Sequence, residues 1–333
     1  MPLDSPVPPV RDSIIKLADR IIRRIKQHRT AEGFSDDQIY TIMDEALRLL
    51  QPLGALVTLE APCLVFGDIH GQLTDLLRFW ELVGSPPKKQ WLCLGDYVDR
   101  GCKGFEVILL LICYKIKFPT MVHLLRGNHE CQKTNRIYGF YTEMAHKRSI
   151  AMWLRFNKKP KSINECDEGV QVDLLWADPT NESCDYRFNI NRNTSVMFGE
   201  TALRAFCKLL NLDLVVRAHE AIQDGFQFTS GKRCCTLFSA PNYCGNDGNS
   251  ASVMHVGAAY DITFTTLQPR ISSKETPSAS SQEPQPLCNY TNVKSPSLQP
   301  SPHHSIPKES SGSKEDASGG VPLIPPTVDG GTK

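Results

Sequence analysis

Three short apolar segments, each followed at once by a cluster of polar residues, constrain the fold of this 333-residue chain most strongly. Segments 63–66, 91–94 and 121–125 have the length and composition of buried strands. Helical segments at 72–83 and 105–117 separate them. This β-α-β-α-β order predicts three parallel strands joined by right-handed crossovers. The carboxyl ends of the three strands should therefore meet along one edge of the sheet.

The polar clusters lie at these carboxyl ends, which is where open α/β sheets bind ligands. They read Gly67-Asp68-Ile69-His70-Gly71, Gly95-Asp96-Tyr97-Val98-Asp99-Arg100-Gly101 and Arg126-Gly127-Asn128-His129-Glu130. Asp68 and His70 are two residues apart, so their side chains point to the same side of an extended chain. Any one cluster is explained by an ordinary turn, but three on consecutive strands predict convergence on one crevice.

The residue types in this crevice favour divalent metal ions. Carboxylate, imidazole and amide ligands suit manganese, iron or zinc better than a thiolate site does. We expect Asp68, His70 and Asp96 to hold one ion. Asp96, Asn128 and His219 would help to hold a second ion, with Asp96 as the bridge. Such a pair of ions can activate a water and clamp a phosphate for in-line displacement.

The same clusters supply groups for acid catalysis and phosphate binding. Arg100 and Arg192 can present planar guanidinium groups to phosphoryl oxygens. His129 follows the predicted ligand Asn128 and is not itself needed as a ligand. Asp99 is placed to orient His129, and a histidine held in this way can protonate a leaving alkoxide.

The remaining sequence predicts one α/β (α+β) domain at residues 1–270 and a disordered tail at 271–333. The tail is rich in Ser and Pro, poor in large apolar residues and without periodicity. Amphipathic helices are predicted before the first strand, the second of them opened by a Ser35–Gln38 capping box. Helix 201–210 and strands 212–216, 235–238, 252–256 and 261–267 follow later.

Bulk composition excludes some classes of protein. The formal net charge of +1 gives no sign of a nucleic-acid or membrane surface. The longest apolar run, 107–114, is too short to span a bilayer. The first residues do not have the pattern of a secretory signal. The 12 cysteines are scattered, which predicts reduced thiols in the cytoplasm or nucleus.

The three clusters resemble the signature motifs of the metal-dependent phosphoprotein phosphatases, and most closely those of the type-1 serine/threonine enzymes. Segments 136–141, 174–179, 217–219 and 239–245 extend the similarity, which covers about residues 10–270. The resemblance implies a metallophosphoesterase-like central β-sandwich flanked by helices, two metal ions, and hydrolysis of phosphoserine and phosphothreonine. Carried over to this sequence, it implies five metal ligands: Asp68, His70, Asp96, Asn128 and His219. It implies that His129 is the general acid and Asp99 its partner. It also implies that Arg100 and Arg192 bind phosphate and that Tyr243 is the aromatic residue beside the cleft.

The chain departs from the family between Trp153 and Leu174. The family has a longer segment there, with a strand that ends in a His-Gly-Gly motif and provides a ligand to the second ion. This sequence has a short polar connection and no histidine between His146 and His219. We therefore expect a weakened second metal site.

A hydrophobic groove that binds regulatory peptides in this family is partly matched. Leu214, Phe228 and Phe264 fit the family pattern. Asp261 stands where an apolar residue is expected, and Glu220 replaces the amide that usually follows the Arg-Ala-His motif. A charge in the groove should weaken docking of apolar side chains.

Several functional hypotheses remain open from the sequence. The first is a metal-dependent serine/threonine protein phosphatase that acts on phosphoproteins and is impaired by the missing ligand segment. The second is an inactive pseudophosphatase that binds phosphoproteins or regulatory subunits. A third is that the sequence lacks a coding segment near residues 154–173. A metallonuclease is a weaker rival because no basic surface bias is present.

Overall fold

The computed structural model describes residues 9–157 and 169–270. Its central element is a five-stranded sheet in the order β11-β10-β1-β2-β3. Strands β1 (Cys63–Phe66), β2 (Gln90–Cys93) and β3 (Val122–Leu124) run parallel. Strand β10 (Ala251–Val256) is antiparallel to β1, and β11 (Ile262–Leu267) is antiparallel to β10. Helices α3 (Leu73–Val83) and α4 (Gly104–Lys117) connect the parallel strands. The predicted β-α-β-α-β unit is confirmed.

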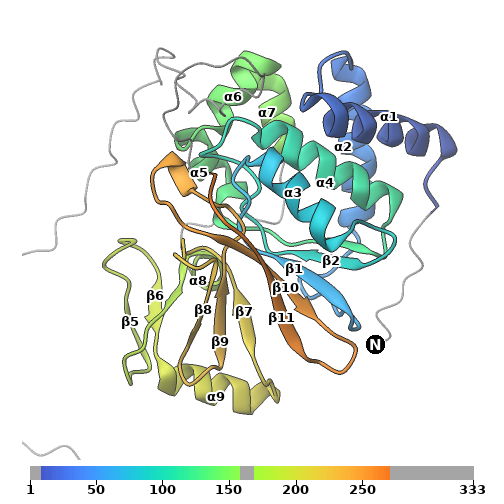
Figure 1. Ribbon diagram of the computed structural model, residues 1–333. Helices are drawn as coiled ribbons and strands as arrows, with labels where there is room; N and C mark the ends of the chain where they lie inside the picture. Colours follow the sequence, from blue (N-terminus) through green and yellow to red (C-terminus); the bar gives the residue numbers. More distant parts are fainter. Residues whose placement is uncertain (1–8, 158–168, 271–333) are drawn as a thin grey trace, which may run out of the picture. The chain divides into compact units, whose positions relative to one another are not determined.

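A layer of helices covers one face of this sheet (Figure 1). It contains α1 (Asp12–His28), α2 (Asp36–Leu50), α3 and α4. Leu64 and Phe66 of β1 point into this layer and belong to the largest hydrophobic core. The expected capping box opens α2: the Ser35 backbone N–H donates to Gln38 Oε1 at 3.0 Å, and the Gln38 backbone N–H donates to Ser35 Oγ at 3.3 Å. The buried apolar faces of these helices pack against the sheet and stabilise it.

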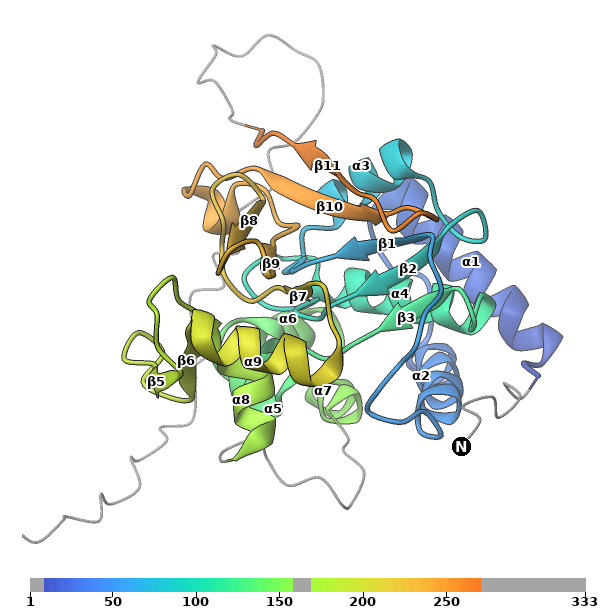
Figure 2. The same cartoon turned by 90° about the horizontal axis from the view of Figure 1, so that it is seen from below.

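A second sheet packs against the other face of the first. It has the order β7-β9-β8, formed by β7 (Val215–Arg217), β9 (Cys234–Leu237) and β8 (Phe226–Thr229). Val65 of β1, which lies between the two helix-facing residues, joins a core with Leu237 and Met254. This alternation along β1 buries both faces of the strand, as expected for the centre of a sandwich. The predicted β-sandwich flanked by helices is confirmed (Figure 2).

Helix α9 (Glu200–Leu210) covers the outer side of the second sheet, where Leu203 and Cys207 pack with Cys234 of β9. A small third sheet in the order β4-β6-β5 lies beside it, formed by β4 (Asp178–Pro179), β6 (Val196–Phe198) and β5 (Tyr186–Phe188). Helix α8 (Val170–Trp176) precedes β4. Strands of two or three residues have no usable alternation, which is why the sequence did not predict this sheet.

The segment that follows β3 is mostly helical. It contains a short turn η1 (Asn128–Glu130) and helices α5 (Gln132–Ile137), α6 (Phe140–Lys147) and α7 (Ile150–Phe156). A second short turn, η2 (Tyr243–Gly245), follows β9. The predicted disordered tail at 271–333 and most of the polar connection after α7 lie outside the described residues. Within the described ranges, no helix has both the length and the apolar character needed to cross a membrane.

Candidate metal centre and active site

The polar clusters do converge at the carboxyl ends of the parallel strands. The loops after β1 and β2 are joined through their backbones: the His70 N–H donates to Asp96 O at 2.9 Å, and the Gly101 N–H donates back to His70 O at 3.0 Å. The second sheet is tied to the same place, because the Ser239 N–H donates to Asp68 O at 3.2 Å. The site is therefore built where both sheets of the sandwich meet.

Several site residues have a backbone conformation that is rare for residues with a side chain. The φ angles are positive at His70 (47°), Asp96 (53°), Asp99 (69°), Arg100 (67°) and His219 (77°). Such conformations persist only where surrounding contacts enforce them, and they gather at functional sites. The interlocking backbone hydrogen bonds provide that enforcement here.

Asp68, His70 and Asp96 form a group that fits a single divalent ion. His70 Nε2 lies 3.7 Å from Asp68 Oδ2 and 4.0 Å from Asp96 Oδ2. Ligand atoms bonded at about 2.0–2.2 Å to one ion can be at most about 4.4 Å apart, so both distances are compatible with a shared ion. His70 Nδ1 lies 2.9 Å from Val98 O, which fixes the tautomer that leaves Nε2 available.

Electrostatics support a cation at this position. The three side chains are buried, and desolvation raises the pKa of Asp96 well above its ordinary value. Burial opposes protonation of His70, but the nearby carboxylates of Asp68 and Asp96 outweigh it and raise the pKa of His70 to about 9. The group thus takes up positive charge readily, as a metal site does.

Asp96 also contacts the second predicted group. Asn128 Oδ1 lies 2.9 Å from Asp96 Oδ2 and 2.9 Å from His219 Nδ1. An amide oxygen this close to a carboxylate oxygen is the arrangement that a cation between them would explain. The His219 N–H donates to Asp68 Oδ1 at 3.1 Å, which ties this group to the first. His219 Nε2 is buried without a hydrogen-bond partner in the described part of the chain. Asp96 Oδ2, Asn128 Oδ1 and His219 Nδ1 thus lie next to one another, and this donor set fits a second ion with Asp96 between the two.

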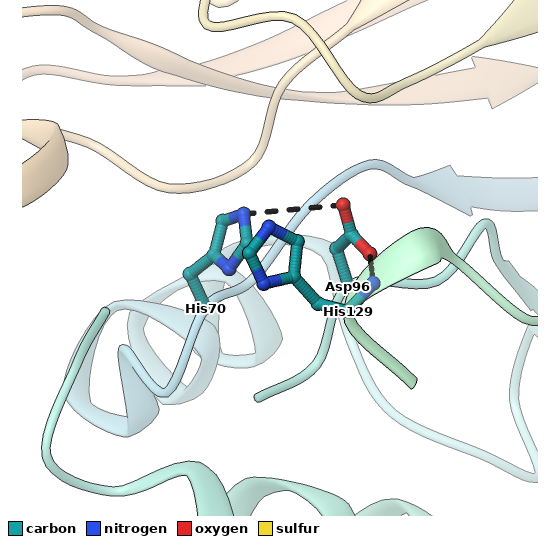
Figure 3. A group of neighbouring side chains, drawn as sticks. All are labelled: His70, Asp96 and His129. Carbon is teal, nitrogen blue, oxygen red and sulfur yellow. Dashed lines mark hydrogen bonds and ion pairs between the residues drawn. The ribbon is translucent and has the colours of Figure 1, made fainter. Parts of the chain in front are cut away.

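His129 lies against the first group (Figure 3). One potential ligand atom from each of His70, Asp96 and His129 lies within 4.8 Å of the other two. The His129 backbone N–H donates to Asp96 Oδ1 at 2.9 Å, and the His129 and His70 rings meet edge to face at 4.6 Å. Proximity alone therefore allows His129 to act either as a ligand or as a proton donor.

The contact with Asp99 favours the second role for His129. His129 Nδ1 lies 2.6 Å from Asp99 Oδ2, and Asp99 Oδ1 accepts the Phe140 N–H at 2.8 Å. Asp99 thus fixes the ring and holds Nδ1, which leaves Nε2 as the group that can exchange a proton.

The two predicted phosphate-binding arginines are held from different elements. Arg192 Nε donates to the buried Asp178 Oδ2 at 2.8 Å, and Arg192 NH2 donates to His219 O at 3.1 Å. The Arg100 guanidinium stacks over the Tyr138 ring at 4.3 Å. Arg192 thus lies beside His219, and Arg100 lies beside Tyr138, whose ring is 5.3 Å from that of His129.

Tyr243 lies beside the first group, with its ring 5.1 Å from that of His70 and 5.2 Å from that of Phe238. Sequence reasoning placed it beside the cleft, and the structure brings it to the metal-binding group. Every predicted site residue therefore lies in this one region.

Glu130 is a site residue to which the sequence assigned no role. Its partly buried carboxylate accepts three backbone N–H groups, from Asp96 at 2.8 Å, Tyr97 at 2.8 Å and Gly127 at 2.9 Å. It thus fastens the loop after β2 to the loop after β3. A glutamate two residues after a ligand gave no signal of this, because its partners come from a distant loop.

The residues of the predicted regulatory groove pack against one another and against the core between the sheets. Phe264 stacks on Phe226 at 3.7 Å and meets Phe228 edge to face at 6.2 Å. Leu214, Phe228 and Phe264 are partly buried and pack against the core between the sheets. Asp261 is exposed in the turn between β10 and β11. Peptide docking there stays a prediction.

A cavity borders the second group. Asp68, Asp96, Asn128 and His219 line one end of it, and no other histidine lines it in the described part of the chain. Asp173 is the one further carboxylate in the lining, and its Oδ1 accepts the Ser195 hydroxyl at 2.8 Å. No described residue thus replaces the ligand that the family resemblance led us to expect.

Comparison with known proteins identifies the family to which this site belongs. Residues 61–223 match the calcineurin-like phosphoesterase family, and this match spans all the clusters described above. A Caenorhabditis elegans protein named "Putative serine/threonine-protein phosphatase C06A1.3" is 39% identical over 244 residues, covering 63% of this chain and 67% of that protein. The chain belongs to the calcineurin-like phosphoesterase family. The sequence-based prediction of a metal-dependent phosphatase relationship is confirmed.

Two further matches agree with this family. "Putative serine/threonine-protein phosphatase C27B7.6" of Caenorhabditis elegans is 38% identical over 290 residues. The alignment covers 76% of this chain and 64% of that protein, so the chain spans less than two thirds of its length. A Saccharomyces cerevisiae serine/threonine phosphatase, described as similar to human phosphatase PP5, superimposes with a TM-score of 0.68 at 26% identity. That match covers 77% of this chain and 98% of the yeast chain.

Proposed function

We propose that this calcineurin-like phosphoesterase is a serine/threonine protein phosphatase that hydrolyses phosphoserine and phosphothreonine with the help of two divalent ions. One observation carries the proposal: Asp96 lies between two groups of metal-competent side chains, with the His129–Asp99 pair beside it. The names of the relatives support the protein substrate class.

The chain's own residues divide the work of the reaction. When bound, the ions, of the manganese, iron or zinc class, supply the positive charge that makes a water nucleophilic and stabilises phosphoryl oxygens. Arg100 and Arg192 bind and orient the remaining phosphoryl oxygens. Asp99 holds His129 Nδ1, so that Nε2 can give a proton to the leaving serine or threonine oxygen.

A second candidate function rests on the incomplete second group. Asp96, Asn128 and His219 provide three ligands, and no further histidine faces them among the described residues. Loss of a group that merely supports a ligand already costs about 10–100-fold in metal affinity or activity. A chain that binds phosphoproteins or regulatory subunits without turnover is therefore the alternative.

The deciding experiment is turnover of p-nitrophenyl phosphate across a manganese titration, with Asp96→Asn as the blank. We expect metal-dependent turnover above the blank, followed by release of phosphate from phosphoserine and phosphothreonine peptides but not from a phosphotyrosine peptide. A folded protein that does not exceed the blank would contradict catalysis. Metal-independent binding of the same phosphopeptides would then support the binding protein.

We also propose that the protein works in the cytoplasm or nucleus. No disulfide joins cysteines in the described part of the chain, which fits a reducing compartment. Imaging of the full chain with a fluorescent tag at either end tests this proposal, and accumulation in the secretory pathway would contradict it.

A further inference from the structure

A large apolar cavity adjoins the metal-binding side chains and has no role in the proposed reaction. Its volume is about 690 Å³. Its apolar lining comes from the loops after β2 and β3, from α8, β5, β6, α9 and β7: Leu94, Leu125, Val170, Leu174, Leu175, Tyr186, Val196, Phe198, Ala202, Leu203, Phe206, Val215 and Val216. Hydrocarbon thus surrounds the space on several sides.

The cavity leaves an unusual amount of apolar surface in contact with solvent. Phe206 is 45% exposed, Leu174 79% and Val170 72%, although all three line the cavity. Monomeric proteins rarely expose contiguous apolar surface of this kind unless something binds there. The volume lies within the range of about 300–1,000 Å³ that is usual for small-molecule sites, which are mostly apolar with a few polar groups.

The polar part of the lining includes the metal-binding side chains together with Arg126, Asp173 and Arg217. These metal-binding side chains are Asp68, Asp96, Asn128 and His219, and they follow β1, β2, β3 and β7, whereas much of the apolar lining comes from α8, β5, β6 and α9. Arg217, also in the lining, is held by Asp178 Oδ1 at 2.8 Å and Glu220 Oε2 at 2.6 Å. A ligand that fills the cavity would therefore place a polar head at the metal-binding end and hydrocarbon elsewhere.

We propose that this cavity binds the hydrocarbon tail of an amphiphilic phosphomonoester, such as an alkyl phosphate, whose phosphate reaches the metal-binding side chains. The inference rests on the proposed function for its phosphate end only. A peptide is the competing occupant. β7 lines the cavity and pairs only with β9 among the described strands, so its other edge could accept a further strand. A peptide carries an N–H and a carbonyl at every residue, however, and an apolar lining on several sides would leave many of them unsatisfied. A hydrocarbon tail has no such cost.

The test is calorimetric binding of n-alkyl phosphates of increasing chain length to the whole chain in the presence of manganese, below their micelle concentrations. Each methylene buried in an apolar site contributes about 0.8 kcal/mol, so affinity should rise about fourfold per added methylene until the cavity is full. Asp96→Asn should weaken every member of the series but leave the gain per methylene unchanged.

Two exposed positions provide matched variants on one helix. Phe206→Glu places a charge in the cavity lining and should abolish the gain per methylene. Leu209→Glu is the control, because Leu209 lies on the same helix α9, is 81% exposed and is not in the lining. Leu174→Glu gives an independent disruption from α8. All three positions are exposed, so equal unfolding midpoints are expected.

The outcomes separate this inference from the proposed function. A gain per methylene that Phe206→Glu removes and Leu209→Glu keeps supports the inference, even if no phosphate is released. If p-nitrophenyl phosphate is hydrolysed but the affinity for n-alkyl phosphates does not depend on chain length, the inference is overturned and the proposed phosphatase function stands. Absence of binding throughout the series also overturns it, as does a phosphopeptide that alone shows sensitivity to Phe206→Glu.

Discussion

His129 illustrates how the site is specified at the scale of single residues. Its backbone N–H is bound by Asp96, its Nδ1 by Asp99, and its ring rests against His70. Asp99 is in turn held by the N–H of Phe140 at the start of α6. These contacts fix the position and orientation of the imidazole and leave Nε2 as the ring nitrogen that Asp99 does not hold.

Asp99→Asn should lower kcat by about 10²–10³-fold, because general acid catalysis contributes about 10²–10⁴-fold and the amide cannot balance an imidazolium charge. Steady-state kinetics should show a larger loss with phenyl phosphate than with p-nitrophenyl phosphate, whose leaving group needs no proton. The exposed Asp37 provides the control, and Asp37→Asn should be silent. Equal losses on both substrates would contradict the acid role.

At the scale of the elements, the loops after β2 and β3 are in direct backbone contact. A methyl group added at Gly127 would collide with Asp96 Oδ1 and with the Asp96 backbone nitrogen. Gly95 is equally constrained, since its φ of 124° and the nearby Gly127 backbone leave no room for a side chain. The glycines of the motifs are thus required by how closely the loops approach, and not only by turn geometry.

Gly127→Ala should cost about 1–3 kcal/mol of unfolding free energy, because overpacking forces the loops apart. It should also weaken manganese binding by about 10–100-fold, since Asp96 is displaced. Urea denaturation and calorimetric titration measure the two effects. Gly54→Ala is the control, because the nearest atom to its added methyl is 3.9 Å away. Unchanged metal affinity in Gly127→Ala would refute the coupling.

The start of α4 depends on a glutamate from another helix. Glu143 of α6 is buried and accepts the N–H groups of Gly104 at 3.1 Å and Phe105 at 2.9 Å. Lys147 Nζ donates to it at 2.8 Å and to Glu106 Oε2 at 2.6 Å. A carboxylate from α6 therefore replaces the local cap that α4 lacks and joins the two helices.

Glu143→Ala should destabilise the fold by about 2–4 kcal/mol, because two helix N–H groups and the Lys147 ammonium lose a buried partner. Urea denaturation monitored by circular dichroism gives the value. Glu182 offers a matched control, since it pairs with Arg187 at 2.9 Å and both side chains are exposed. Glu182→Ala should cost less than about 1 kcal/mol, and a similar effect of the two variants would be evidence against the capping role.

At the scale of the whole molecule, the site joins the two sheets of the sandwich. Asp68 follows β1 and forms an isolated parallel bridge with Phe238, which follows β9. The Gly67 N–H donates to Ser239 Oγ at 2.8 Å across the same junction. Metal binding should therefore stabilise the complete domain, because its ligands come from both sheets.

Manganese at about 100-fold excess over its dissociation constant should add about 2.7 kcal/mol to the unfolding free energy. For a domain of this size, that corresponds to a rise in the melting temperature of about 5–10 °C. Differential scanning calorimetry measures the shift, and a chelator should reverse it. Asp96→Asn should remove most of the effect, whereas a full shift in that variant would exclude Asp96 as the shared ligand.

The β-α-β-α-β unit and the convergence of Asp68, His70, Asp96 and Asn128 can be predicted from the amino-acid sequence, because parallel crossovers obey local and nearly invariant geometric rules. Features that depend on long-range hydrogen bonds and packing become visible only in the folded chain. These are the anchoring of Arg192 on Asp178, the fastening of two loops by Glu130, and the small third sheet whose strands are too short to show a period. The apolar cavity belongs to the same class, since its lining comes from residues spread between Leu94 and Val216. No local pattern records that such residues enclose one space.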